Sequence, residues 1–199
     1  MNNSYPVVSF DNTQRAFQHK TDDELTKARF LFSLMSNPTL VKIGASLTPL
    51  ALRMGLPIKG LIRKTLFAQF IGGENLAQTA TVAKKLAQHK VKVILDYGVE
   101  GKEGEENFDK ACQVFLKVID HAASEPNIPF MSVKVTGFAR FGLLELLHQK
   151  MKAHQLSLLA RYEAMLDSIS SEEKEEWARV CSRVETVCAY AASKNISVS

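Results

Sequence analysis

Three short runs of strand-forming residues alternate with long amphipathic stripes in the second half of the chain, and this alternation strongly limits the folds available. The runs are "VKVILD" (residues 91–96), "FMSVKVTG" (130–137) and "ISVS" (196–199). Between them, apolar residues recur at helical spacing over residues 108–122, from Leu143 to about Met165, and from Trp177 to Ala191; "SSEEKEEW" (residues 170–177) predicts the start of the last helix. The order strand, helix, strand, helix, helix, strand predicts βαβ units, and therefore a parallel sheet.

A parallel sheet of this kind needs more strands than the sequence supplies. Parallel strands are normally covered on both faces and belong to sheets of several strands. This chain offers two strands and the beginning of a third. We therefore expect the N-terminal part of a longer α/β protein, apparently truncated, or one piece of a nicked protein. The alternative is a helical domain that carries two short strands.

The first 70 residues are predicted to be helical. Thr21, followed by three acids in "TDDEL", predicts a capped helix start. The apolar stretch over residues 28–52 is interrupted by Pro38 and Pro49, which predicts several short helices. A further helix is expected over residues 58–70. We interpret residues 1–70 as an N-terminal helical part, and residues 71–199 as the first part of a barrel domain.

Composition argues against several classes of protein. The net charge of +4 and pI of about 8.9 are only mildly basic, so no nucleic-acid partner is expected. Cys112, Cys181 and Cys188 form no CxxC pair and lie near no histidine at metal-ligand spacing, so no metal site is expected. All three fall on apolar helical stripes, which predicts buried, reduced thiols. The sequence shows no signal-peptide pattern and no apolar run of the roughly 20 residues that a membrane span needs. A cytoplasmic protein is therefore expected.

Four basic residues, Arg53, Lys59, Arg63 and Lys64, flank an apolar segment in the N-terminal part. Two interpretations stay open. The segment either contacts a membrane surface, peripherally at the inner membrane face, or packs as a helix against the main domain.

Lys134 is the one charged residue in the apolar run 130–137. If the strand alternates, Met131, Val133 and Val135 share one face, and Ser132, Lys134 and Thr136 share the other. In a closed barrel of parallel strands this second face would point inward near the C-terminal end, where barrel enzymes keep their chemistry. A lysine there could hold an anionic group or form a Schiff base. The alternative is an edge-strand lysine that faces solvent.

Asp96 closes the first strand, where an acid could pair with basic residues of a site or simply cap a turn. Glu100 follows in the charged stretch "EGKEGEE" and is either a site residue or a loop charge; the solvated stretch favours the loop charge. The stretch "FIGGEN" (residues 70–75) is glycine-rich but lacks the pattern of a phosphate-binding loop. Its glycines more simply allow a tight turn or a close backbone approach before the next helix.

Three of these stretches, in this order and at these intervals, resemble the FAD-dependent proline dehydrogenase family. "FIGGENLAQT" resembles the family's Phe-x-x-Gly-Glu-Thr element before the barrel, although Asn75 stands where the family has threonine. "VKVILDYGVEG" resembles its first barrel strand, which ends in aspartate. "MSVKVTGFARFG" resembles its second strand, with the Lys-x-Thr signature. The likeness extends from about Asp22 to the end of the chain.

The resemblance implies a distorted (βα)8 TIM-type barrel that holds FAD over the strand ends. It implies oxidation of L-proline to 1-pyrroline-5-carboxylate, a step of proline catabolism, with hydride transfer to FAD and electron transfer to a quinone. Carried over by position, Lys134 would contact the proline carboxylate close to the flavin. Asp96 would be the first-strand acid of the active site.

The family's later strands, its acidic third-strand segment and its arginine pair on a late helix have no counterpart in these 199 residues. The resemblance therefore implies proline oxidation by a longer protein, and we expect the fragment alone to be inactive and to form an oligomer or aggregate. Two other functions stay open. One is a barrel enzyme of aldolase type with Lys134 as the Schiff-base nucleophile, and the other is a non-enzymatic helical interaction or membrane-surface module.

Overall fold

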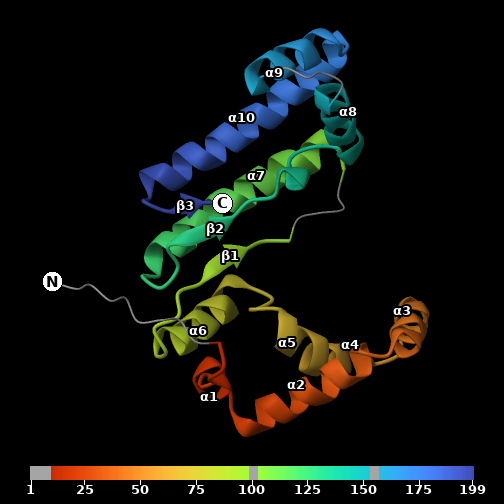
Figure 1. Ribbon diagram of the computed structural model, residues 1–199, viewed down its shortest axis with the longest axis vertical. Coiled ribbons are helices and arrows are strands. Elements are labelled where there is room, and N and C mark those ends of the chain that lie inside the picture. Colours follow the sequence, from red (N-terminus) through yellow and green to blue (C-terminus); the bar gives the residue numbers. More distant parts are fainter. Residues whose placement is uncertain (1–9, 99–102, 153–156) are drawn as a thin grey trace, which may run out of the picture. The chain divides into compact units, whose positions relative to one another are not determined.

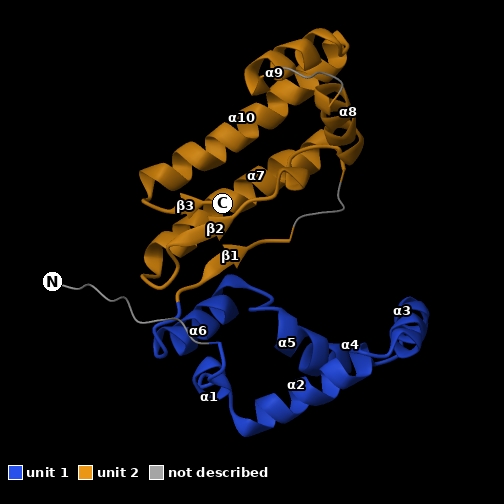
Figure 2. Cartoon of the chain, viewed as in Figure 1, with its two compact units in different colours: residues 1–91 blue, residues 92–199 orange. Residues whose placement is uncertain are grey.

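The computed structural model describes residues 10–98, 103–152 and 157–199. The chain divides into two compact units, residues 1–91 (unit 1) and residues 92–199 (unit 2), shown in separate colours in Figure 2. The domain division at residue 70 stays a prediction.

Unit 2 contains a small parallel sheet. Its strands are β1 (Ile94–Asp96), β2 (Phe130–Ser132) and β3 (Ser197–Val198), in the spatial order β1-β2-β3. Ile94 is paired with Phe130, which is paired in turn with Ser197. This arrangement confirms the predicted parallel sheet and the strand nature of "ISVS". The described residues form three strands, and a closed barrel stays a prediction.

Two long helices of unit 2, α7 (Glu105–Ser124) and α10 (Ser171–Ser193), contact each other and the sheet (Figure 1). The apolar stripe predicted for α7 is buried over its whole length. Phe115 on α7 and Met131 on β2 are both fully buried. Leu95 on β1 is also buried, whereas its neighbours Ile94 and Asp96 are exposed. One face of the sheet therefore forms the core together with the helices.

Helix α10 begins and ends at signals that are visible in the sequence. At its start, the Ser170 hydroxyl accepts from the Glu173 amide, and the Glu173 carboxylate accepts from the Ser170 amide. At its end, Asn195 adopts a left-handed conformation with φ of 57°, which terminates the helix. Helices α8 (Phe141–Lys152) and α9 (Leu158–Asp167) connect β2 to α10 and match the helical region predicted there.

Unit 1 is helical, as predicted. Its elements are α1 (Thr13–Ala16), α2 (Asp22–Met35), α3 (Pro38–Arg53), α4 (Lys59–Ile62), the π-helix η1 (Arg63–Phe67), α5 (Ala68–Phe70) and α6 (Leu76–Ala87). Thr21 and Glu24 form the predicted capping box of α2. Among the helices of the described part of the chain, none has both the length and the apolarity that crossing a membrane takes.

The predicted helix break at Pro49 is wrong, because α3 continues through this residue to Arg53. Pro38 instead occupies the first turn of α3, where its missing N–H is not needed. A proline inside a helix leaves one carbonyl without a donor. No residue of α3 is buried, so water can solvate that carbonyl and the helix persists.

The prediction of three buried thiols is also wrong. Cys112 is buried on α7, but Cys181 is only half-buried and Cys188 is exposed; all three are free. Burial raises the pKa of the Cys112 thiol. The apolar stripe of α10 is narrower than its sequence suggests, because Val180 and Val187 face the core while Cys188 lies beside them on the solvent side.

Candidate functional site at the strand ends

The structure brings together the two residues predicted for a site. Asp96 is the last residue of β1, and Lys134 lies two residues beyond the end of β2. The carboxyl ends of parallel strands meet at one edge of the sheet, so both side chains emerge there. The Lys134 Nζ atom lies 2.9 Å from Asp96 Oδ2, and the two side chains are 45% and 50% exposed. The pair is therefore an ion pair that solvent can reach.

Lys134 is not inside a strand, which corrects the prediction that the strand spans residues 130–137. Strand β2 ends at Ser132, and Val135–Gly137 (η2) form a short 3-10 turn in which the Gly137 amide donates to the Lys134 carbonyl. The backbone of Lys134 itself is still extended, with φ of −105° and ψ of 121°. Lys134 is exposed and Met131 is buried, as predicted, but Val135, expected on the face of Met131, is 39% exposed, so the alternation does not continue beyond the end of β2.

The open face of the sheet continues from this ion pair. Ile94 on β1 and Phe130 on β2 are 56% and 43% exposed, although both are large and apolar. Side chains two residues apart on a strand share a face, so Ile94 lies on the face of Asp96. The site thus combines an ammonium group and a carboxylate with an adjoining apolar surface, which suits a small ligand that carries an anionic group.

Arg183 on α10 fixes the segment that follows Lys134. Its Nη1 atom donates to the carbonyl of Phe138, 3.2 Å away, and Phe138 is fully buried. Phe138 also packs against Phe115, with 5.1 Å between ring centroids. The turn that carries Lys134 is thereby held between α7 and α10.

The same guanidinium also holds the start of α7. Arg183 Nε donates to Asp109 Oδ1 at 2.8 Å, Nη2 donates to Glu105, and the group lies over the Phe108 ring. Burial opposes the charged form of Glu105, but hydrogen bonds from Arg179 and Arg183 hold its pKa below the usual value. Although burial disfavours the charge of Arg183, the two acids raise its pKa. One arginine therefore ties together the segments that follow β1 and β2.

Sequence reasoning missed Arg183, although a signal was present. Arg183 falls between Val180 and Val187 at helical spacing, on the stripe that α10 buries. Glu105 and Asp109 are four residues apart on α7, so they lie on one side of that helix. A basic residue inside an apolar stripe, with two acids at helical spacing on a neighbouring helix, predicts a buried ion cluster.

In unit 1, the "FIGGEN" stretch is a helix start, as the simpler interpretation predicted. The Asn75 side chain caps α6 by accepting from the Gln78 amide at 3.0 Å. A Cβ atom on Gly73 would come within 2.8 Å of the Thr79 backbone nitrogen, so only glycine fits there. Glu74 forms an ion pair with Arg63. Glu100, interpreted as a loop charge, lies outside the described residues.

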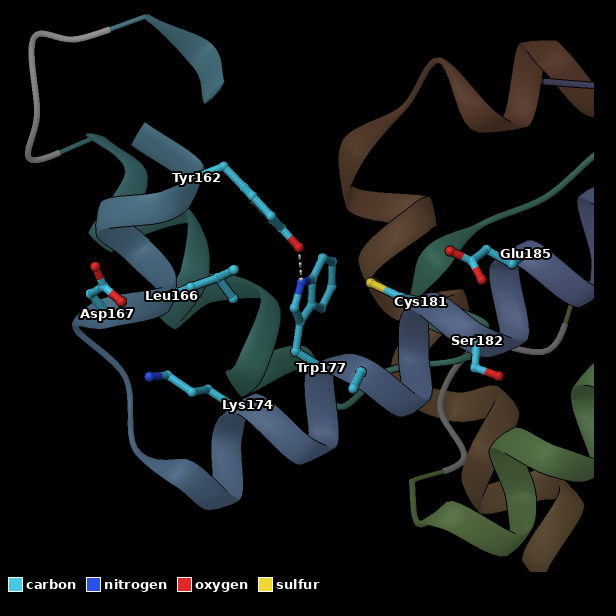
Figure 3. A pocket seen from close by; sticks show the side chains of 9 residues that line it. Tyr162, Leu166, Asp167, Lys174, Trp177, Cys181, Ser182 and Glu185 are labelled. Carbon is cyan, nitrogen blue, oxygen red and sulfur yellow. Dashed lines mark hydrogen bonds between the residues drawn. The ribbon is translucent and has the colours of Figure 1, made fainter. Parts of the chain in front are cut away.

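A pocket of about 570 Å³ lies away from the ion pair, between α9 and α10 (Figure 3). Its lining includes Tyr162 and Trp177, and the Trp177 Nε1–H donates to the Tyr162 hydroxyl at 3.0 Å. Neither Lys134 nor Asp96 lines it. Residues 10–98, 103–152 and 157–199 contain no group of three or more His, Cys, Asp or Glu side chains that could hold a metal ion.

Comparison with known proteins found distant relatives. "Proline dehydrogenase 1, mitochondrial" of Caenorhabditis elegans is 30% identical over 133 residues, which are 65% of this chain and 22% of that protein. The Bos taurus protein of the same name is 28% identical over 144 residues, covering 69% of this chain and 24% of the relative. "Carbapenem antibiotics biosynthesis protein CarD" of Pectobacterium carotovorum subsp. carotovorum is 29% identical over 129 residues, which are 65% of this chain and 30% of that protein.

The chain spans between 22% and 30% of the length of these curated relatives. No family model matches it, and no solved structure matches it. The similarity therefore supports membership of the proline dehydrogenase family only loosely. It supports an oxidoreductase activity no more strongly.

Proposed function

We propose that this chain supplies the first strands and helices of a proline dehydrogenase, an enzyme that oxidises L-proline to 1-pyrroline-5-carboxylate. The observation that carries the proposal is the ion pair between Lys134 and Asp96 at the carboxyl edge of a parallel sheet. In enzymes built on barrels of parallel strands, the chemistry lies at this edge. Relatives named proline dehydrogenase are only distantly similar to the chain, so the activity is a proposal for a longer protein.

In this proposal, Lys134 binds the carboxylate of proline and Asp96 holds the ammonium in place. A lysine ammonium is a compact charge on a flexible stem, which suits a carboxylate that arrives from solvent. Asp96 reaches it at 2.9 Å, so the ammonium is oriented before the substrate binds. The exposed Ile94 and Phe130 would line the apolar side of the site, next to the pyrrolidine ring.

The residues at the strand ends also fit one edge of a flavin. The Lys134 ammonium group is 45% exposed and can donate more than one hydrogen bond, so it could contact a flavin oxygen as well as a carboxylate. When bound, FAD would supply the chemistry, because it accepts the hydride that leaves proline. The residues of this chain would bind and orient the substrate. A quinone as electron acceptor and a peripheral membrane contact complete the proposal.

The aldolase-type alternative is less well supported by the geometry. A Schiff base forms from a neutral amine, whereas a carboxylate 2.9 Å away stabilises the ammonium form of Lys134. Borohydride trapping of a carbonyl substrate on Lys134 would favour this alternative. A non-enzymatic module built on residues 22–70 would instead keep its binding activity when residues 91–199 are deleted.

The proposal is tested by assaying proline-dependent dye reduction in the longest polypeptide that contains these residues, after its flavin absorbance is recorded. We expect Lys134→Ala to lower kcat/KM at least 100-fold, since an active-site charge pair contributes about 3 kcal/mol to substrate binding and positioning. Asp96→Asn should have a smaller effect, because it leaves the ammonium in place.

Lys117→Ala is the matched control, since Lys117 is an exposed lysine on α7 with no part in the ion pair at the strand ends. Normal activity of Lys134→Ala would remove Lys134 from the site. Absence of both flavin and proline oxidation in the wild-type polypeptide would overturn the function itself.

A further inference from the structure

The pocket between α9 and α10 is large enough for a small molecule and takes no part in the site at the strand ends. Its volume of about 570 Å³ lies within the range of roughly 300–1,000 Å³ that is usual for ligand pockets. All of its lining residues belong to these two helices of unit 2. The chemistry of the two helix faces therefore decides which ligand the pocket could hold.

Two aromatic side chains form the centre of the pocket and hold each other in place (Figure 3). The Trp177 Nε1–H donates to the Tyr162 hydroxyl at 3.0 Å, so the one polar atom of the indole is already satisfied within the wall. Both side chains are half-buried. The indole therefore offers a ligand its apolar and π surface, and the face of an indole attracts a cation more strongly than that of a phenyl ring.

At one end of the pocket, Glu185 is a carboxylate without a cation beside it. It is exposed and forms no ion pair with any residue that the structure describes. Partners on the same helix would stand three or four positions away. These positions of α10 hold Cys181, Ser182, Cys188 and Ala189, which carry no charge. The charge of Glu185 is therefore available to a ligand.

Cys181 lies between Trp177 and Glu185 and adds an uncharged wall (Figure 3). Its thiol is free and half-buried. Burial raises the pKa of this thiol, and the nearby Glu185 charge raises it further. The thiol therefore stays protonated at neutral pH, and this part of the pocket is a neutral surface that an apolar group can contact.

The opposite end of the pocket carries one charge of each sign, from Asp167 and Lys174 (Figure 3). These two charges offset each other, so this end favours neither an anion nor a cation. The two helices that form the pocket are acidic as a whole, because residues 158–193 contain seven acidic and four basic residues and so have a net charge of −3. Both the uncompensated Glu185 and the surrounding charge favour a cationic ligand.

We propose that this pocket binds a small organic amine, with its ammonium group beside Glu185 and its apolar body against Trp177 and Cys181. The carboxylate accepts a charge-assisted hydrogen bond from the ammonium group, and the indole stabilises the cation and the groups attached to it. An anionic ligand is less favoured, because Asp167 offsets Lys174 whereas no cation offsets Glu185. The proposal does not depend on proline oxidation, since neither Lys134 nor Asp96 lines the pocket.

Trp177 is the only tryptophan of the chain, so its fluorescence reports directly on the pocket. The full chain is titrated with phenethylamine, which is protonated at pH 7 as a lysine side chain is, and with two analogues of similar size, the neutral 2-phenylethanol and the anion phenylacetate. For the amine we expect a saturable change with a Kd of about 1 mM or lower. Binding should be about fivefold tighter than that of the alcohol and should weaken in high salt. Equal binding of amine and alcohol, or tighter binding of phenylacetate, would overturn the proposal.

A pair of variants tests the carboxylate. Glu185→Gln should weaken binding of the amine about fivefold and leave binding of the alcohol unchanged, because it removes only the charge. Glu163→Gln is the matched control, since Glu163 is an exposed acid of α9 that does not line the pocket, and it should bind like the wild type. An equal loss in both variants would mean that the general negative charge of the helices attracts the amine, which would refute the assigned site.

Two further variants test the rest of the pocket. Lys174→Gln removes a cation, so it should tighten binding of the amine by up to about threefold; weaker binding would contradict the proposal. Trp177→Leu, measured by isothermal titration calorimetry, should weaken binding of the amine about fivefold. Unchanged binding in this variant would place the amine outside the pocket and would also overturn the proposal. Circular dichroism checks that each variant keeps its helices.

Discussion

The two units of this chain differ in how many of their apolar residues are buried. Of the 22 buried apolar residues in the described parts of the chain, 20 belong to unit 2. Unit 1 contributes Ala80 and Ala83, both on α6. Its helices α2 and α3 are amphipathic or apolar but bury nothing. Apolar content therefore does not by itself produce a core. In unit 2 the core forms because two long helices lie across one face of a sheet.

Charged residues show the same contrast. In unit 2, Arg183 is buried and saturated by Glu105, Asp109 and a backbone carbonyl. In unit 1, most of the cations between residues 25 and 73 are exposed. Buried charge in a protein needs partners within the fold, whereas exposed charge beside exposed apolar surface favours a partner outside it. The buried charge of unit 2 thus contributes to its own packing, whereas the exposed charges of unit 1 are accessible to a partner.

The largest effect should come from the core of unit 2. Phe115 is fully buried and packs against the rings of Phe138 and Tyr97, so Phe115→Ala should lower the free energy of unfolding by about 3–5 kcal/mol. This loss of stability is measured by urea unfolding, monitored through the fluorescence of Trp177. Trp177 is the only tryptophan of the chain and lies in unit 2. Leu47→Ala, at an exposed leucine of unit 1, should change stability by less than about 0.5 kcal/mol.

The same two variants test whether the units differ in how they bury apolar residues. The unfolding of the Leu47→Ala variant is monitored by circular dichroism at 222 nm. If this variant lost as much stability as Phe115→Ala, the exposed apolar side chains of α3 would be packed in solution. The exposed surface of unit 1 would then not exist as described.

A smaller effect is expected at the buried arginine. Arg183→Met should lower the free energy of unfolding by about 2–3 kcal/mol, because Glu105 and Asp109 lose their partner while remaining partly screened by solvent. Arg179→Met is the matched control. Arg179 also contacts Glu105, at 3.1 Å, but is 48% exposed, so its removal should destabilise the fold much less than the removal of Arg183. Equal effects would show that burial of Arg183 contributes nothing beyond a surface ion pair.

Much of unit 2 could be predicted because its signals are local. The alternating runs and stripes gave the order of strands and helices, and the capping box at Ser170 gave the start of α10. The ion pair between Asp96 and Lys134 is compatible with the predicted parallel topology, since the carboxyl ends of adjacent parallel strands share an edge, but the sequence left open whether Asp96 pairs with a basic residue or caps a turn. Their role in a reaction stays a prediction.

What could not be predicted depends on tertiary context. The strand before Lys134 ends early and the turn η2 follows it; Arg183, 45 positions beyond Phe138, donates to the Phe138 carbonyl just after this turn, a contact that no local pattern indicates. Sequence alone also gave no way to see that α3 would tolerate Pro49, because this depends on water reaching the helix. The same holds for the exposure of Cys188, which depends on the width of the face that α10 buries.

The smallest expected effect concerns pH and sharpens the contrast between two capping boxes. Hydrogen bonds from Lys85 and from the Thr21 amide lower the pKa of Glu24 from 4.5 to about 2. Glu173 in unit 2 also has a lowered pKa, but through Ser170 within its own helix start. A carboxyl with a depressed folded-state pKa stabilises the fold fully above its unfolded pKa and loses this contribution as the pH falls toward the folded value.

Acidification from pH 5 to pH 2 should therefore loosen the tie between α2 and α6 in unit 1, by no more than about 1 kcal/mol because Glu24 is 39% exposed. Glu24→Gln keeps a capping side chain but removes the charge, so its helicity should respond less to acid than that of the wild type. Lys85→Gln is the complementary variant and should behave similarly, since it removes the other partner. If both variants titrate like the wild type, the acid response comes from local caps such as that of Glu173, and Glu24 makes no measurable long-range contribution.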